Sequence, residues 1–148
     1  MHSHRTLERH LKAAAASALH SSDDVERSAV GLFAALSLRG DAVRDAPQTV
    51  ATAEALVRFV EDRAGDASPA DFEALHAAAL ALFQVGGGAW ARGGAALRGA
   101  FEVAPRRDGL LIAPETAIRR WGARGASVAT TAYAVRTGTA ALRVPRFR

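Results

Sequence analysis

The chain has 148 residues, about the length of one domain, and 49% of them are hydrophobic, so it can build a globular core. It contains no cysteine, which excludes disulfide bonds, cysteine-ligated metal sites and a cysteine nucleophile. Its formal net charge is +4, and Lys12 is the one basic residue that is not an arginine. Guanidinium groups are always charged and donate hydrogen bonds in a fixed fork that suits phosphate and carboxylate groups.

The first 85 residues predict a series of helices. Apolar residues recur at spacings of three and four over Thr6–Leu19, which predicts the first helix. The second is expected to begin at Ser22, where serine and aspartate residues cluster, and to end at Gly40. The third carries its apolar face over Val50–Val60 and is expected to end at Gly65.

The fourth predicted helix has the clearest start signal, with Ser68 as its N-cap and Pro69 at its first position. It is apolar on nearly all sides as far as Val85, which is typical of a helix in the middle of a bundle. The next segment, Gly86–Gly99, contains six glycines. It is compatible with a loop or with a glycine-rich helix in close contact with a neighbour, and the sequence leaves both open.

The pattern changes in the last third of the chain. The apolar run Gly109–Ala113 predicts a short buried strand, and Pro114–Trp121 predicts one or two helical turns. The segments Ala126–Arg136 and Thr139–Val144 are rich in Thr, Val and Ala and flank a Thr-Gly pair, so they predict a β-hairpin. The expected fold class is therefore α+β and mainly α, with an N-terminal bundle of about four helices and a small C-terminal part that contains a β-hairpin.

We expect one domain over residues 1–148, divided into a helical bundle (1–85), a glycine-rich connection (86–100) and a basic β-containing part (101–148). The N-terminus lacks the apolar core of a signal peptide, and the longest uncharged stretch is interrupted by glycines and polar residues. The expected location is therefore the cytoplasm, with no membrane partner.

Charge is divided unevenly along the chain. Residues Met1–Glu73 carry eight basic and twelve acidic residues, whereas Ala74–Arg148 carries eleven arginines and three acidic residues. After Glu115 there are seven arginines and no side-chain carboxylate. An excess of arginine of this kind is typical of a surface that contacts nucleic-acid phosphates.

The sequence therefore indicates a set of candidate nucleic-acid contacts and two aromatic residues that could stack on unpaired bases. The candidate contacts are Arg92, Arg98, Arg119, Arg120, Arg124, Arg136, Arg143 and Arg146, and the stacking candidates are Trp121 and Tyr133. Two alternatives stay open: the arginines pair with acidic residues of the same chain or of another copy, or they form an ordinary solvated surface.

Catalytic and metal-binding motifs are not evident. The glycine-rich segment lacks the Gly-Lys-Ser/Thr ending of a phosphate-binding loop and follows a predicted helix where such loops follow a strand. The N-terminal histidines His2, His4 and His10 lack carboxylate or cysteine residues at ligand spacing. His76 falls in the apolar fourth helix, which is typical of a core histidine. We expect no enzyme activity, no cofactor and no metal site.

The leading hypothesis is a non-catalytic subunit of a larger assembly, such as a small helical subunit of a ribonucleoprotein complex, whose Arg-rich C-terminal part contacts nucleic-acid backbone while the helical half packs against neighbouring subunits. The alternative is a structural protein of a virion or particle, such as a phage capsid, neck or tail accessory protein, located in the virion. There the arginines and the C-terminal strand would make subunit contacts. A homo-oligomer is compatible with both. A third hypothesis, an enzyme or a ligand-binding domain, needs a pocket that gathers His76, Glu102, Asp108 or Tyr133.

Overall fold

The computed structural model describes residue 19 and residues 21–140. Most of the first predicted helix, Thr6–Leu19, lies outside these residues. The described elements, in chain order, are α2 (Ser22–Arg39), the short 3-10 helix η1 (Gly40–Val43), α3 (Pro47–Ala64), α4 (Phe72–Val85), α5 (Gly87–Val103), β1 (Arg106–Arg107), β2 (Leu110–Leu111) and α6 (Glu115–Gly138).

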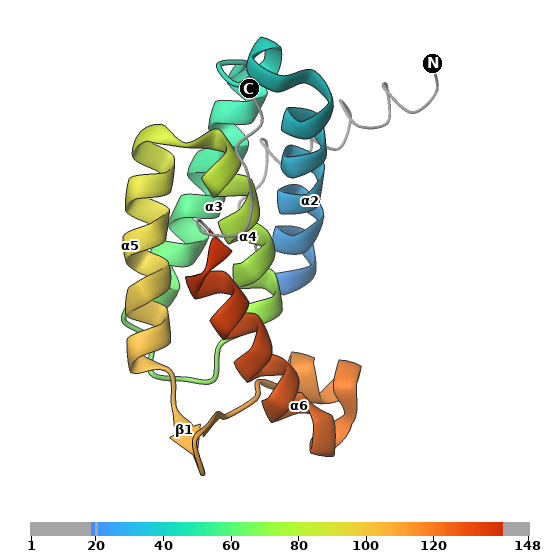
Figure 1. The fold of residues 1–148 in the computed structure, drawn as a ribbon, viewed down its shortest axis with the longest axis vertical. Helices are drawn as coiled ribbons and strands as arrows, with labels where there is room; N and C mark the ends of the chain where they lie inside the picture. Colours follow the sequence, from blue (N-terminus) through green and yellow to red (C-terminus); the bar gives the residue numbers. More distant parts are fainter. Residues whose placement is uncertain (1–18, 20, 141–148) are drawn as a thin grey trace.

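Helix α4 is the centre of the bundle. Successive helices run in alternating directions (Figure 1), and α4 packs against α2, α3, α5 and α6. Ten of its 14 residues are buried, which confirms the expectation that the fourth predicted helix is the core helix. Its largest fully buried side chains, Phe72, Leu75 and Leu82, belong to the main hydrophobic core.

Local polar contacts fix most of the helix ends. The Ser21 hydroxyl accepts a hydrogen bond from the Asp24 backbone N–H at 3.2 Å, and α2 ends at Gly40 with φ +53°, close to the predicted bounds. Helix α4, however, takes Asp71 as its N-cap, so the predicted start at Ser68 is wrong. The Ser68 backbone N–H donates to the Asp66 carboxylate at 2.8 Å, which stabilises a turn before the helix.

The glycine-rich segment forms a helix, α5, which settles the question that the sequence left open. Two of its glycines allow close packing, because a Cβ added at Gly93 would lie 2.6 Å from Leu82 Cδ1 and one at Gly99 would lie 3.3 Å from the Ala64 carbonyl oxygen. Both positions face neighbouring helices, where larger side chains would hold α5 further away. These two glycines therefore serve packing, and they do not break the helix.

The predicted hairpin at Ala126–Arg136 is wrong, because these residues belong to α6. The threonines fit the helix since their hydroxyls donate to the carbonyl four residues earlier, Thr131 to Ser127 and Thr137 to Tyr133, each at 2.7 Å. Of the predicted second strand, Thr139–Val144, residue 139 is in a turn and residue 140 is helical, and the rest lies outside the described residues.

The described hairpin lies earlier in the chain, between β1 and β2. These strands pair antiparallel, with Arg106 opposite Leu111 and Arg107 opposite Leu110. The turn is Asp108-Gly109, and both residues have positive φ, +53° and +80°. This is the combination that a two-residue type I′ turn requires. The expected class, mainly α with a small C-terminal hairpin, is therefore confirmed, although the hairpin lies at other residues.

A kink divides α6 into two segments. Gly122 has φ +72° and ψ 160°, which are not helical values and which an L-residue rarely adopts. The first segment, from Glu115 to the kink, confirms the helical turns predicted for Pro114–Trp121. It turns away from the second segment, which runs alongside α4 (Figure 1).

Candidate nucleic-acid interface

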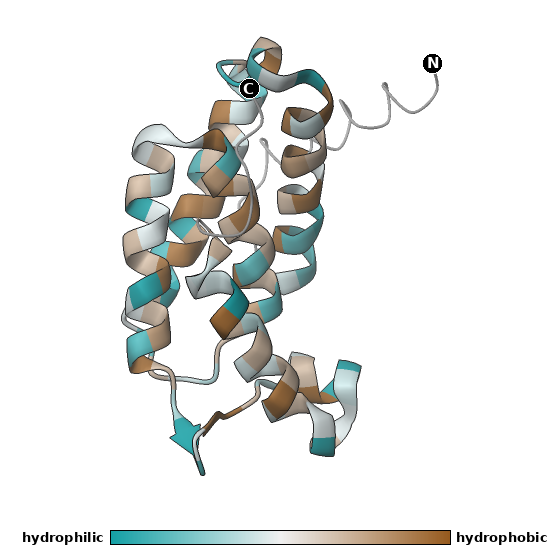
Figure 2. Ribbon diagram, in the orientation of Figure 1, coloured by the Kyte–Doolittle hydropathy of each residue, from teal (hydrophilic) through white to brown (hydrophobic). Residues whose placement is uncertain are grey.

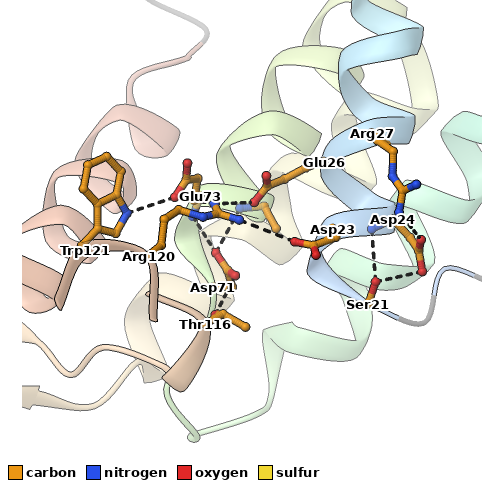
Figure 3. Close-up of polar contacts among 11 residues, drawn as sticks. Ser21, Asp23, Asp24, Glu26, Arg27, Asp71, Glu73, Thr116, Arg120 and Trp121 are labelled. Atoms are coloured by element: carbon orange, nitrogen blue, oxygen red, sulfur yellow. Dashed lines mark hydrogen bonds and ion pairs between the residues drawn. The ribbon is translucent and has the colours of Figure 1, made fainter. Parts of the chain in front are cut away.

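Arg120 lies at the centre of a cluster of carboxylates that joins three helices (Figure 3). Its guanidinium lies 2.7 Å from Glu73 on α4, and 3.0 Å from Glu26 and 3.5 Å from Asp23 on α2. Hydrogen bonds to Glu73 and Glu26 raise the pKa of Arg120. The side chain is 34% exposed, and it connects α6 to the starts of α2 and α4.

Two further bonds hold the first segment of α6 against the start of α4. The Trp121 indole N–H donates to the Glu73 carboxylate at 3.2 Å, and the Thr116 hydroxyl donates to Asp71 at 2.8 Å (Figure 3). The Trp121 side chain is nevertheless 47% exposed. Its indole edge is fixed by Glu73 while part of its ring remains accessible to a partner.

The acidic residues gather here because two helices begin side by side. The first turns of α2 and α4 carry Asp23, Asp24 and Glu73, and carboxylates are favoured at the positive end of the helix dipole. Partial burial raises the pKa of Glu26, against the effect of its hydrogen bond to Arg120. Each helix start favours carboxylates on its own, and side by side these carboxylates repel one another. The positive charge of Arg120 offsets that repulsion.

Arg92 makes a similar connection between α5 and α3. Its guanidinium forms two 3.0 Å hydrogen bonds with Glu61 and further bonds of 3.1 and 3.2 Å with Glu54. These bonds raise the pKa of Arg92 and lower that of Glu61. Arg92 and Arg120 therefore pair with carboxylates of the same chain, which is one of the two alternatives to nucleic-acid contact that the sequence left open.

The other candidate arginines are distributed over several contacts. Arg119 lies 3.7 Å from Glu115, and the Arg136 guanidinium lies over the Tyr133 ring at 5.8 Å. Arg98 and Arg124 are exposed and have no carboxylate partner among the described residues. The candidates Arg143 and Arg146 lie outside the described residues.

The hairpin adds two arginines that the sequence analysis did not single out. The Arg106 guanidinium donates to the carbonyls of Phe101 at 2.7 Å and Ala104 at 3.0 Å, so it caps the end of α5. Arg107 is exposed and has no carboxylate partner within the part of the chain that the structure describes. The Asp-Gly pair that follows would have located this hairpin, because Asp-Gly is a strong hairpin signal.

The hairpin and the α6 kink lie at one end of the bundle (Figure 1). The hairpin carries the exposed Arg107, and the residues around the kink include the exposed Arg119 and Arg124 and the half-exposed Trp121. We call these four residues the basic end. Strand β1 is strongly hydrophilic there (Figure 2). Asp108 and Glu115 are exposed at the same end, so the surface is mixed, with arginine in excess.

A second polar group lies between α4 and α6. The rings of His76 and Tyr133 are 5.8 Å apart, and burial followed by the charge of Arg136 lowers the pKa of His76. His76 Nδ1 and the Thr130 hydroxyl are buried and have no hydrogen-bond partner in the described structure. Glu102 and Asp108, by contrast, are exposed, so the structure brings together two of the four residues that the enzyme hypothesis needs.

Comparison with known proteins finds no family model that matches the chain, and no similar curated protein or solved structure. Among residues 19 and 21–140, no helix combines the length and the apolar character that a membrane span requires.

Proposed function

We propose that the protein is a non-catalytic subunit of a larger assembly and that its basic end contacts the backbone of a nucleic acid. The observation that carries this proposal is the exposure of Arg107 and Arg124, which have no carboxylate partner among the described residues. Arg119 adds a third charge, since its distance of 3.7 Å from Glu115 leaves most of its donors available. Arg120 connects this segment of α6 to α2 and α4 through its ion pairs with Glu26 and Glu73.

The chemistry of the basic end favours contact with phosphates over readout of bases. Guanidinium forks bind phosphate oxygens without regard to sequence, and no Asn- or Gln-rich helix is present to read base edges. The accessible part of the Trp121 ring can stack on an unpaired base. Tyr133, the other stacking candidate, is half-buried beside His76 and under Arg136, so Trp121 is the better stacking residue.

The proposal is tested by fluorescence anisotropy of labelled single-stranded and double-stranded oligonucleotides. The triple variant Arg107→Ala/Arg119→Ala/Arg124→Ala removes the basic end. The control Arg27→Ala/Arg58→Ala/Arg63→Ala removes the same charge from exposed arginines on α2 and α3. We expect the first variant to lose binding at least tenfold and the control to stay within about threefold of the wild type.

Equal losses in the two variants would show that net charge alone governs binding, and the basic end would then not be the interface. Absence of binding by the wild-type protein at low salt would reject nucleic-acid contact. Circular dichroism spectra of all three proteins control for folding.

The second candidate function is that of a structural subunit of a particle, in which the same chain makes repeated protein contacts. The observation that favours it is a row of exposed apolar side chains on the outer face of α6, including Val128 and Val135, which are 57% and 50% exposed. Such side chains add nothing to phosphate binding, and contiguous exposed apolar surface is typical of protein interfaces.

A further inference from the structure

The first segment of α6, Glu115–Trp121, lies against the bundle without contributing to its core. No residue between Leu111 and Ala126 is buried, and none of them belongs to the main hydrophobic core. The larger apolar side chains of the segment, Ile118 and Trp121, are 43% and 47% exposed. Segments with few buried apolar contacts open at a lower free-energy cost than the core of a protein. We call Glu115–Trp121 the arm.

Side-chain hydrogen bonds and ion pairs hold the arm against the starts of α2 and α4 (Figure 3). The Arg120 guanidinium lies 2.7 Å from Glu73 and 3.0 Å from Glu26, and the Thr116 hydroxyl donates to Asp71 at 2.8 Å. Partly exposed polar contacts are replaced by contacts with water when they break, so their net contribution is small. The arm can therefore leave the bundle while the core stays packed.

Both ends of the arm have backbone that can change direction. Gly122 has φ +72° and ψ 160°, and a Cβ added there would have no atom within 4 Å, so the chain has open space at this point. At the other end, residues 113 and 114 lie outside regular secondary structure. The chain is anchored on either side of these joints, because the Leu111 N–H donates to the Thr131 hydroxyl at 2.9 Å and Ala126 is buried. A few residues of this kind are enough to serve as a hinge.

We propose that the arm opens away from the bundle as a unit, about Gly122, and that Arg120 is the latch that holds it closed. A released helix of about seven residues is too short to be stable in water. Opening therefore breaks the backbone hydrogen bonds of the arm as well as its side-chain contacts. The rest of the bundle keeps its fold, because the main hydrophobic core is made by other segments.

The state of the arm determines whether the basic end is complete. Arg119 and Trp121 lie on the arm, whereas Arg107 lies on the hairpin and stays in place when the arm opens. A nucleic acid that binds the complete basic end should therefore stabilise the closed arm. The opening itself goes beyond the proposed function, and its effect on binding rests on that function.

The test is native-state hydrogen exchange of the full chain, measured residue by residue by NMR in water and in low urea, without nucleic acid. We expect the amides of Ile118–Trp121 to exchange at least about tenfold faster than those of α4, at a rate that low urea hardly changes. Exchange in α4 should accelerate with urea, because it requires exposure of the core. Arm amides with the rate and the urea dependence of α4 would overturn the proposal.

Two variants open the arm in different ways. Arg120→Ala removes the latch, and Gly122→Ala strains the closed backbone, since alanine rarely adopts a φ of +72°. The control Arg92→Ala removes an arginine that pairs with two carboxylates of α3. The control Gly125→Ala adds a methyl group in ordinary contact, 3.8 Å from Trp121 Cβ.

Both test variants should lose the protection of the arm amides while the second segment of α6 stays protected. The two controls should keep the exchange of the arm within about threefold of the wild type. Retained protection in either test variant, or an equal loss in its control, would overturn the proposal. The NMR spectra verify that each variant is folded, and the exchange of the wild-type protein decides the question if a variant is not.

Gly122→Ala also tests the effect on binding, because it opens the arm without removing a charge. Its affinity for a labelled oligonucleotide should be at least about threefold lower than that of Gly125→Ala. An open arm with unchanged affinity would reject the effect of the arm on binding. A wild-type protein that binds no oligonucleotide would reject the proposed function, whereas the exchange measurement would still decide whether the arm opens.

Discussion

Arg120 contributes to the fold through carboxylates that lie far from it in the sequence. It binds Glu73 on α4 and Glu26 on α2 at 2.7 and 3.0 Å, and without it these acidic side chains would face one another uncompensated. Hydrogen bonds that involve charged groups stabilise by about 1.5–3 kcal/mol, and partial exposure reduces that value. The residue therefore has a structural role that its place in an arginine-rich segment does not suggest.

Arg120→Ala should lower the free energy of unfolding by about 1–2 kcal/mol, because it removes the cation and leaves the acidic cluster. Arg119→Ala is the matched control. That side chain is 69% exposed and has one 3.7 Å contact, so its loss should change stability by less than about 0.5 kcal/mol. Urea denaturation measures both values, and equal effects of the two substitutions would contradict the structural role of Arg120.

The buried position of His76 predicts how the free energy of unfolding depends on pH. Burial, and secondly the charge of Arg136, lowers the pKa of His76 below its usual value of 6.5, so the folded state favours the neutral ring. The unfolded chain binds a proton at this histidine more readily than the folded chain does. The contribution of His76 to the free energy of unfolding is therefore fully present above pH 6.5 and is lost as the pH falls through the folded-state pKa. Two residues of α6 act on this ring: Tyr133 lies with its ring 5.8 Å away, and Arg136 contributes its positive charge.

His76→Leu should flatten the decline in unfolding free energy below pH 6.5, because leucine fills the same space without a titrating group. Urea denaturation of both proteins over the range from about pH 7.5 to about pH 5.0, above and below the ordinary histidine pKa of about 6.5, gives the comparison. The same pH dependence in both proteins would mean that other groups cause the decline.

At the scale of elements, the sequence predicts the presence of α2, α3 and α4 because their signals are local, although the start of α4 at Ser68 is wrong. These signals are the apolar periodicity, the capping serine at the start of α2, and the glycines that end α2 and α3, Gly40 and Gly65. Each can be recognised without knowing which helices become neighbours in the fold. For the second segment of α6 the sequence predicts a hairpin, because a segment rich in Thr and Val is compatible with strands, and this prediction is wrong. The helix of this segment depends on tertiary packing of small residues against α4, which composition alone does not show.

The glycines of α5 give a direct test of its packing. Gly93→Ala should destabilise the protein by about 1–3 kcal/mol, because the added methyl group would lie 2.6 Å from a fully buried leucine, Leu82. Gly88→Ala should instead stabilise it by about 0.5–1 kcal/mol, since nothing lies within 4 Å and alanine favours a helix. Thermal denaturation compares the two variants. Stabilisation by both would show that α5 is not held against α4 as described.

At the scale of the whole molecule, the uneven charge of the sequence is partly neutralised within the fold. Arg92 and Arg120 lie in the basic half and pair with Glu54, Glu61 and Glu26 in the acidic half. The sequence predicts the charge division but not these pairs, because their partners depend on which helices become neighbours. Two arginines of the basic end, Arg107 and Arg124, stay exposed and have no carboxylate partner among the described residues, and Arg107 enters this end through the hairpin turn.

The measurement that tests the basic end most directly is the salt dependence of binding to a labelled single-stranded oligonucleotide. Three arginine–phosphate contacts predict that the logarithm of the association constant falls against the logarithm of salt concentration with a slope of about −2. The slope should approach zero in the Arg107→Ala/Arg119→Ala/Arg124→Ala variant. A wild-type protein whose binding does not depend on salt, or a variant with an unchanged slope, would contradict the proposed contact between this end of the bundle and the nucleic-acid backbone.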